Sequence, residues 1–219
     1  ICYSGGDDVF IVGAWNEVIE LAVDLKKKFE MYTENTLTIS AGIGVYQHDY
    51  PISVIANEVA ELENMSKNKA GKNAITLFDD GAVHNEYDSE GYQVVISDAT
   101  YSWDEFINEV IGDKYKCIKE FFDNEDERGM GFLYNLLELI RNQEDRINFA
   151  RFVYILARLE PDKEALPEVR QRYNIFSQNM YKWVRLDKAD RNKLTKDGRQ
   201  LKTAMNIYSY IRRNNDKND

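Results

Sequence analysis

The sequence contains few of the residues that mark secreted or hydrolytic proteins. Its 219 residues include only 2 cysteines, 2 histidines and 3 prolines. Cys2 and Cys117 lie far apart without C-x-x-C spacing, which favours buried thiols in a reducing cytoplasm over a metal site or a disulfide scaffold. His48 and His84 have neither ligand spacing nor a nearby serine or cysteine nucleophile. Both histidines are therefore expected at the surface.

Long apolar runs are also missing. No stretch approaches the roughly 18–20 apolar residues of a membrane helix, and no basic-then-apolar leader indicates secretion. We therefore expect a cytoplasmic protein without membrane contact. The composition, 43% hydrophobic and 30% charged, is that of a globular protein with a buried core. Because the chain starts abruptly on an apolar, strand-like segment, we expect it to be a piece of a larger protein.

The negative charge is unevenly distributed along the chain. Residues 141–219 hold 18 Lys and Arg against 11 Asp and Glu, whereas residues 1–140 hold 10 against 27. Such polarity is typical of a chain whose ends meet different partners. The basic end is compatible with nucleic acid phosphates, with an acidic protein neighbour, or with a solvated helical surface.

The first eighty residues alternate between strand and helix patterns. Apolar residues at 1–3 and 9–12 flank the turn Ser4-Gly5-Gly6-Asp7-Asp8, which predicts a β-hairpin. Apolar residues then recur at helical spacing over 15–32, where Lys26, Lys27 and Lys28 are expected on a solvated face. A period of two over 36–45 predicts a strand with one apolar face and one face of small residues. The small face allows close approach by a neighbouring element or by a ligand.

A second helix, beginning at Pro51, and a short strand over 73–78 complete this part. The order is hairpin, helix, strand, helix, strand. It predicts an α+β unit. An antiparallel hairpin that carries acidic residues, with helices across one face, is how a palm domain is organised, but the periodicity indicates the elements and does not by itself establish that topology. The lysines Lys67, Lys69 and Lys72 lie between the second helix and the last strand.

Two adjacent carboxylates at the predicted hairpin tip are compatible with divalent metal binding. Asp7 and Asp8 supply the hard oxygen ligands that Mg²⁺ prefers, and phosphoryl transfer needs little beyond such positioning and charge. Two metal ions held there would activate an attacking hydroxyl and stabilise the leaving pyrophosphate. The same residues also suit an ordinary turn, since Gly and Asp are common in turns.

Helical patterns dominate the second half of the chain. Ser102 and Glu105 have the spacing of a capping box at the start of a helix that reaches about residue 122. Further helices are predicted over 132–143, 145–159, 167–184 and 196–213, with short connections that favour antiparallel packing. Their arginines are expected to face RNA phosphates or a partner subunit, whereas most of the aromatic residues at helical spacing are expected in the core.

Several motifs together resemble a known family. The segments are S-G-G-D-D-V-F-I-V-G at 4–13, T-I-S-A-G-I at 38–43 and G-K-N at 71–73. They resemble the GGDEF and cyclase palm superfamily, and within it the second palm domain of the large, polymerase-like subunit of type III-A CRISPR (Csm) effector complexes. The helical segment at 151–158 resembles the C-terminal domain of that subunit.

The resemblance implies an activity and a set of site residues. In that family the second palm converts ATP into cyclic oligoadenylates when the complex binds target RNA. Asp7 and Asp8 would then be the catalytic residues that hold Mg²⁺ or Mn²⁺. The other implied residues bind the nucleotide: Ser4, Gly5 and Gly6 at the turn, and Lys67 and Lys72, with Lys69 as a rival, at the phosphates.

The resemblance also predicts domains and partners. We expect a ferredoxin-like, GGDEF-related palm over 1–80 that lacks its N-terminal strand, a linker or connecting segment over 81–101, and an all-α bundle over 102–219. The expected partners are ATP, other subunits of the ribonucleoprotein complex, and guide and target RNA through the complex. Protein contact is expected before RNA contact at the bundle.

Two other functions remain open at this stage. One is a cyclic dinucleotide synthase, against which the Asp-Asp pair and the appended helices count. The other is a non-catalytic scaffold, against which the intact Asp7-Asp8 pair counts. Because palm cyclases take a further metal-binding acid from a strand before the hairpin, we expect this chain to be inactive by itself.

Overall fold

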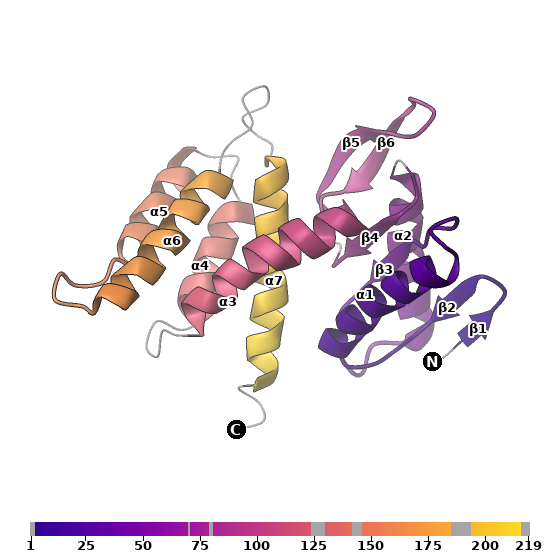
Figure 1. Cartoon of the computed structure of the whole chain (residues 1–219), viewed down its shortest axis with the longest axis horizontal. Helices are drawn as coiled ribbons and strands as arrows, with labels where there is room; N and C mark the ends of the chain where they lie inside the picture. The colour runs from indigo at the N-terminus through magenta and orange to yellow at the C-terminus, as the bar shows by residue number, and fades with distance from the viewer. Residues whose placement is uncertain are drawn as a thin grey trace. The chain divides into compact units, whose positions relative to one another are not determined.

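The protein forms two compact units in a computed structural model that describes residues 3–69, 71–78, 81–123, 130–141, 146–184 and 194–215. Unit 1 spans Ile1–Ile107 and unit 2 spans Asn108–Asp219 (Figure 1). No helix in the described ranges is both long enough and apolar enough to span a membrane. Strands and helices share unit 1 and helices make up unit 2, which confirms the α+β class.

Unit 1 contains seven short strands and two long helices among its described residues. In chain order these are β1 (Tyr3–Gly5), β2 (Asp8–Phe10), α1 (Trp15–Tyr32), β3 (Ala41–Ile43), α2 (Ile52–Asn68), β4 (Ala74–Leu77), β5 (Val83–Tyr87), β6 (Gln93–Ser97) and β7 (Thr100–Ser102). The strands form three separate sheets: β1-β2, β3-β4-β7 and β5-β6. In the central sheet β3 runs parallel to β4, and β7 runs antiparallel to it. The predicted antiparallel pairing is therefore confirmed for β1-β2, β4-β7 and β5-β6, whereas the parallel pairing of β3 with β4 departs from it.

Helix α2 packs directly on the backbone of β3. A Cβ added at Gly42 would lie 2.5 Å from the Glu63 amide nitrogen and 2.7 Å from the Val59 carbonyl oxygen. The small face predicted for this strand thus accommodates a neighbouring helix, not a ligand. Only residues 41–43 join the ladder, where they pair with residues 75–77 of β4. The strand predicted over 36–45 is correspondingly too long.

A chain of buried hydroxyl groups links α2 to the central sheet. The Ser66 hydroxyl donates to the Ala41 carbonyl oxygen at 2.7 Å and lies 2.7 Å from the Thr76 hydroxyl. The Thr76 hydroxyl in turn lies 2.9 Å from that of Thr100. All three side chains are buried, so their mutual hydrogen bonds offset the cost of removing them from water.

Helix α1 has the predicted bounds, but one of its lysines is not solvated. Lys26 is only 6% exposed, and its ammonium lies 2.8 Å from a Glu30 carboxylate oxygen and 3.9 Å from one of Asp104. Its position two turns after the buried Ile19 places it on the same face of the helix, so its aliphatic part packs toward the core and the ammonium is paired. The expectation of a solvated face holds for Lys27 and Lys28, which are exposed.

The stretch 81–101, expected to be a linker, folds into strands. β5 pairs with β6 antiparallel from Val83↔Ser97 to Tyr87↔Gln93, and β7 completes the central sheet. The connecting turn is organised by Asp88, whose carboxylate accepts hydrogen bonds from the backbone amides of Glu90 and Tyr92. Aspartate readily forms such local turns, and the acidic, Gly-containing loop between alternating residues is itself a hairpin signal.

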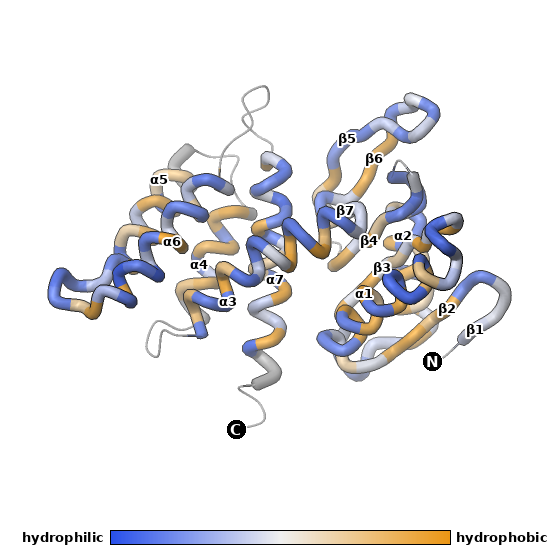
Figure 2. The backbone as a smooth tube through the Cα atoms, in the orientation of Figure 1, coloured by the Kyte–Doolittle hydropathy of each residue, from blue (hydrophilic) through white to orange (hydrophobic). Residues whose placement is uncertain are grey.

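Unit 2 is a bundle of amphipathic helices. A π-helical segment, η1 (Glu105–Tyr115), begins in unit 1, and the chain continues through α3 (Lys116–Phe122), α4 (Met130–Arg141), α5 (Arg146–Ala157), α6 (Pro167–Trp183) and α7 (Lys196–Asn215). These elements confirm the predicted helices, except that the predicted end of one helix at 142–143 and the predicted start of the next at 145 lie outside the described residues. Hydrophobic and hydrophilic stretches alternate along them in Figure 2. The predicted stripe of α4 is the buried one: Leu133, Leu136, Leu137 and Ile140.

The capping box predicted at the start of η1 is present. The Glu105 carboxylate accepts a hydrogen bond from the Ser102 amide at 2.8 Å, and the Ser102 hydroxyl accepts one from the Glu105 amide at 3.2 Å. Trp103, 1% exposed, adds an indole N–H bond to the Ile39 carbonyl oxygen at 2.9 Å. Together they fix where the helix leaves the sheet.

Every fourth residue of η1 and α3 is buried. The seam consists of Phe106, Val110, Lys114, Ile118 and Phe122. A repeat of four is longer than the 3.6-residue turn of an α-helix, and the wider turns of the π-helical part keep the seam aligned. One seam position is charged: the Lys114 ammonium lies 3.0 Å from an Asp197 carboxylate oxygen and 5.0 Å from the centre of the Trp183 ring.

Candidate active site

The predicted acidic turn is a tight hairpin. Gly5 pairs with Asp8, which leaves Gly6 and Asp7 as the two central residues. Gly6 has a φ of +64°, whereas the φ of Asp7 is not positive, the pattern of a type II′ turn. A positive φ is cheap only for glycine, so Gly6 sets the geometry that brings the two aspartates to the tip.

Both aspartates are exposed to solvent, as are Ser4 and Gly6. Because side chains alternate along a strand, Tyr3 shares its face with Gly5, and Gly5 is paired with Asp8. A Cβ at Gly5 would lie 2.6 Å from the Tyr3 hydroxyl oxygen, so the ring of Tyr3 covers this glycine. Tyr3, which the motif analysis missed, is therefore a neighbour of the acidic tip, and its i, i+2 spacing from Gly5 was the available signal.

Lys67, in the last turn of α2, lies within electrostatic range of the acidic pair. Its ammonium is 2.8 Å from a Glu63 carboxylate oxygen, and its side chain is 45% exposed. The hydrogen bond to Glu63 raises the pKa of Lys67, and the nearby charges of Asp8 and Asp7 add smaller upward contributions. This predicted phosphate-binding residue thus lies within electrostatic range of the two aspartates, and its ion-pair partner Glu63 is a carboxylate that sequence reasoning did not single out.

The other two lysines are placed differently. Lys72 is exposed in the turn before β4 with a φ of 54°, and none of the described ion pairs joins it to Asp7 or Asp8. Its carbonyl oxygen accepts a hydrogen bond from Ser40. The side chain of Lys69 is only 13% exposed, and its ammonium lies 2.9 Å from Glu86 and 3.8 Å from Glu105. Lys69 is therefore committed to a second polar cluster.

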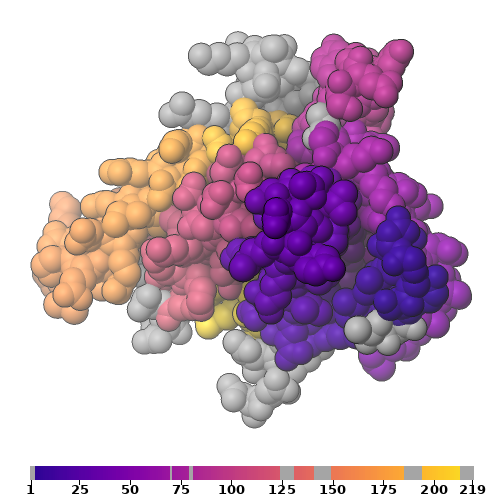
Figure 3. Space-filling model, turned by 45° about the vertical axis from the view of Figure 1, so that its right-hand side comes forward, coloured from indigo at the N-terminus to yellow at the C-terminus, as the bar shows by residue number. Residues whose placement is uncertain are grey.

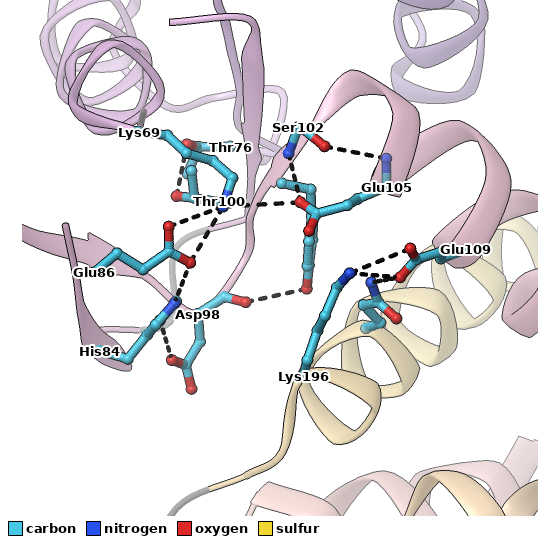
Figure 4. Close-up of polar contacts among 12 residues, drawn as sticks. Lys69, Thr76, His84, Glu86, Asp98, Thr100, Ser102, Glu105, Glu109 and Lys196 are labelled. Atoms are coloured by element: carbon cyan, nitrogen blue, oxygen red, sulfur yellow. Dashed lines mark hydrogen bonds and ion pairs between the residues drawn. The ribbon is translucent and has the colours of Figure 1, made fainter. Parts of the chain in front are cut away.

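That second cluster lies on the inner face of the β5-β6 hairpin (Figure 4). The two ring nitrogens of His84 lie 2.9 Å from an Asp98 carboxylate oxygen and 3.1 Å from one of Glu86. The His84 side chain is only 10% exposed, so its predicted surface position was wrong, whereas His48 is exposed as expected. The alternation of β5 turns His84 inward, where two carboxylates satisfy both ring nitrogens. We call His84, Asp98, Glu86 and Lys69 the inner clamp.

The inner clamp predicts a pH-dependent contribution to stability. Hydrogen bonds from His84 and then Lys69 hold the pKa of the Glu86 carboxyl at about 2, below the usual 4.5. The lowered pKa stabilises the fold above about pH 4.5, and this contribution is lost as the pH falls toward about 2. We expect Glu86→Gln to flatten the pH dependence of the unfolding free energy across that window, by on the order of 1–2 kcal/mol.

Urea unfolding at a series of pH values measures this effect. Glu90→Gln, an exposed change at the tip of the same hairpin, is the matched control and should retain the original slope. Equal slopes in the two variants would rule out a contribution from the inner clamp.

One of the two cysteines, both of which were expected to be buried thiols, lies among the described residues. Cys117, on α3, is half-buried, and burial raises the pKa of its thiol. The Asn179 amide lies 3.5 Å from its sulfur. A raised pKa disfavours the reactive thiolate. Cys2 lies outside the described residues.

The acidic tip has a donor set that fits Mg²⁺ or Mn²⁺ in part. No group of three or more His, Cys, Asp or Glu side chains within the described ranges is arranged to hold a metal ion. Magnesium sites in nucleotide enzymes commonly use one or two carboxylates and complete the shell with water and substrate phosphates. Asp7 and Asp8, adjacent and exposed, match that smaller requirement.

Comparison with known proteins places both units in one kind of protein. The family model "Cas10/Cmr2, second palm domain" matches residues 1–76. The family model "CRISPR RNA silencing complex Cmr2 subunit, second helical domain" matches residues 119–214. An α+β unit with an acidic hairpin, joined to a helical bundle, is thus a palm domain followed by a helical domain of a CRISPR subunit.

The relatives found by sequence comparison indicate the subtype of this subunit. The chain is 40% identical over 211 residues to the CRISPR system single-strand-specific deoxyribonuclease Cas10/Csm1 (subtype III-A) of Mycobacterium tuberculosis, covering 96% of this chain and 22% of the relative. Its Streptococcus thermophilus counterpart is 36% identical over 214 residues, covering 96% and 24%. That of Enterococcus italicus is 37% identical over 186 residues, covering 85% and 22%. The chain belongs to the Cas10/Csm1 family and spans about a quarter of the length of these relatives.

Proposed function

We propose that this chain is the second palm and helical part of a type III-A CRISPR subunit that makes cyclic oligoadenylates from ATP. The observation that carries the proposal is the pair of exposed carboxylates, Asp7 and Asp8, at the tip of a glycine turn within electrostatic range of Lys67. The family match supplies the setting, which is antiviral defence by a ribonucleoprotein complex. The proposal includes the relation of this palm to GGDEF cyclases, which rests on the motif.

The residues of the acidic tip have different proposed roles in metal binding and phosphate binding. Asp7 and Asp8 would hold Mg²⁺ or Mn²⁺, which when bound lowers the barrier to attack by a ribose hydroxyl and stabilises the leaving pyrophosphate. Gly6 lets phosphate groups approach the backbone, since no Cβ stands over the turn and nothing lies within 4 Å of that position. Ser4 and Gly5 flank the approach on β1.

Lys67 is the proposed phosphate ligand of α2. Its ammonium is held by Glu63 while 45% of the side chain stays exposed, so an incoming phosphate competes with one carboxylate near the surface. Exposed ion pairs contribute about 0–1 kcal/mol, so replacing Glu63 by a phosphate as the partner of Lys67 costs little free energy. Lys72 stays a prediction for the same role, and Lys69 is less suited because it is committed to Glu86.

The relatives' printed name includes a single-strand-specific deoxyribonuclease activity. That name describes proteins of which this chain matches about a quarter, and the two matching family models describe a palm and a helical domain. We place the cyclase step, and not the nuclease, on this chain. Other subunits, and guide and target RNA through them, are the proposed partners of the whole protein.

Synthesis by the assembled complex tests the proposal. The full-length protein, with its partner subunits, guide RNA and matching target RNA, is incubated with radiolabelled ATP and Mg²⁺ or Mn²⁺. We expect adenylate oligomers that depend on target RNA and fall at least about 100-fold in the Asp7→Ala, Asp8→Ala double variant, since both proposed metal ligands are lost.

Asp24→Ala, an exposed acidic change on α1, is the control and should leave synthesis unchanged. Oligomers from labelled GTP instead of ATP would favour a cyclic dinucleotide synthase. No product from a complex that still binds guide and target would favour a scaffold.

A further inference from the structure

The outer face of the β5-β6 hairpin carries no charge. It consists of Val83, Asn85 and Tyr87 on β5 and Gln93 and Val95 on β6, which we call the hairpin face. All five residues are exposed, with Val83 at 50%, Val95 at 57% and Tyr87 at 68%. In Figure 3 the hairpin stands out from the rest of unit 1 as a projecting lobe. The centres of protein–protein interfaces are typically depleted of charged residues and enriched in aromatic ones, and the hairpin face has tyrosine and aliphatic side chains without charges.

The surroundings of the hairpin face argue against a nucleic acid. Residues 73–113 contain no lysine or arginine but 10 aspartates and glutamates. Two of the acids, Asp88 and Glu90, lie in the turn at the tip of the hairpin. Phosphate binding depends on Lys and Arg, and an acidic rim repels a polyanion. The charge favours instead a protein surface with an apolar centre and a basic rim.

The opposite face explains why the hairpin can present such a surface. Isolated two-stranded hairpins are marginally stable in water. Here the inner clamp joins β5 to Lys69 at the end of α2 and to Asp98 after β6, and Ile96 is fully buried beneath the ladder. A surface that is already ordered loses little entropy on binding, which favours affinity.

We propose that the hairpin face is a docking surface for another protein chain of the ribonucleoprotein complex, with an apolar centre that covers Tyr87 and Val95 and basic residues that meet Asp88 and Glu90. This inference rests on the proposed membership in that complex, but not on cyclase activity. It assigns a role to a segment that neither the acidic tip nor the helical bundle uses.

Site-specific photocrosslinking identifies the occupant. The full-length protein carries benzoylphenylalanine in place of Tyr87 and is purified in complex with its partner subunits and guide RNA, with and without target RNA. We expect one dominant adduct with another protein chain. An adduct with either RNA, an adduct within the same chain, or no adduct would each overturn the inference.

A second test measures how strongly variants of the hairpin face bind the crosslinked protein. Val95→Glu places a charge in the hairpin face, whereas Tyr32→Glu places one at the end of α1, on a site that is more exposed, at 88% against 57%. We expect association with the crosslinked protein to weaken at least about tenfold in the first variant and to stay unchanged in the second. Equal effects would overturn the assignment. If the adduct forms but the complex makes no oligomers, the docking surface stands and the cyclase proposal fails.

Discussion

Replacing Gly42 with alanine is expected to lower the unfolding free energy of unit 1 by about 1–3 kcal/mol. The new methyl group would meet the backbone of α2 at 2.5 Å and 2.7 Å, and backbone atoms cannot swing aside as a side-chain end can. Either α2 lifts from the sheet or β3 shifts away from β4. Both movements loosen the packing around Ser66 and the buried hydroxyl chain.

Amide hydrogen exchange in β3, β4 and α2 measures this loss locally, and urea unfolding measures it globally. Gly131→Ala is the matched control, because no atom lies within 4 Å of the added Cβ and the residue is in helix α4. That change should stabilise unit 2 by about 0.5–1 kcal/mol through helix propensity. If Gly42→Ala were as stable as the original chain, α2 would not pack on β3 as closely as described.

Lys114→Ala is expected to destabilise unit 2 by about 2–4 kcal/mol. Lys114 is 2% exposed within the seam of η1 and α3, so its aliphatic stem is buried, and its ammonium lies over the Trp183 ring. Truncation leaves a cavity and removes the contact between the ammonium and the ring. Its partner Asp197 is 47% exposed, so that carboxylate can return to water without a large penalty.

Lys114→Met separates packing from charge. Methionine keeps most of the stem, and replacing buried ionic groups by apolar ones of similar volume is often neutral or stabilising. We expect the methionine variant to lie within about 1 kcal/mol of the original chain in urea unfolding. A loss as large as that of the alanine variant would mean that the ion pair and the ring contact, rather than the stem, stabilise the seam.

Local patterns in the sequence were sufficient to predict the helices. α1, α4, α6 and α7 begin and end within about two residues of the predicted bounds, because each has a long apolar stripe and clear terminal residues. The strands were predicted less well. How much of the segment 36–45 forms a strand depends on its pairing with β4. The sequence of β5 is polar, and this segment is a strand because it pairs with β6 and is held by the inner clamp. Such partners are distant in sequence, so period alone does not reveal them.

In the candidate site, too, local features could be predicted from the sequence and contacts between distant segments could not. The turn at Gly6 and Asp7 was predictable, because glycine is required where φ is positive. The choice among lysines was not, since Lys67, Lys69 and Lys72 are close in sequence but have different neighbours. The tertiary structure pairs Lys69 with Glu86, whereas Lys67 lies within electrostatic range of the aspartates. Whether these residues bind metal and nucleotide stays a prediction.

The absence of lysine and arginine from residues 73–113 also has a practical consequence for protein chemistry. Trypsin cleaves after those two residues, so it has no site between Lys72 and Lys114. β4, both strands of the hairpin, β7 and nearly all of η1 therefore leave the digest as one long acidic peptide, 73–114. Peptide mapping of this region requires a protease that cuts at acidic or aromatic residues, and the abundant acids and tyrosines provide those sites.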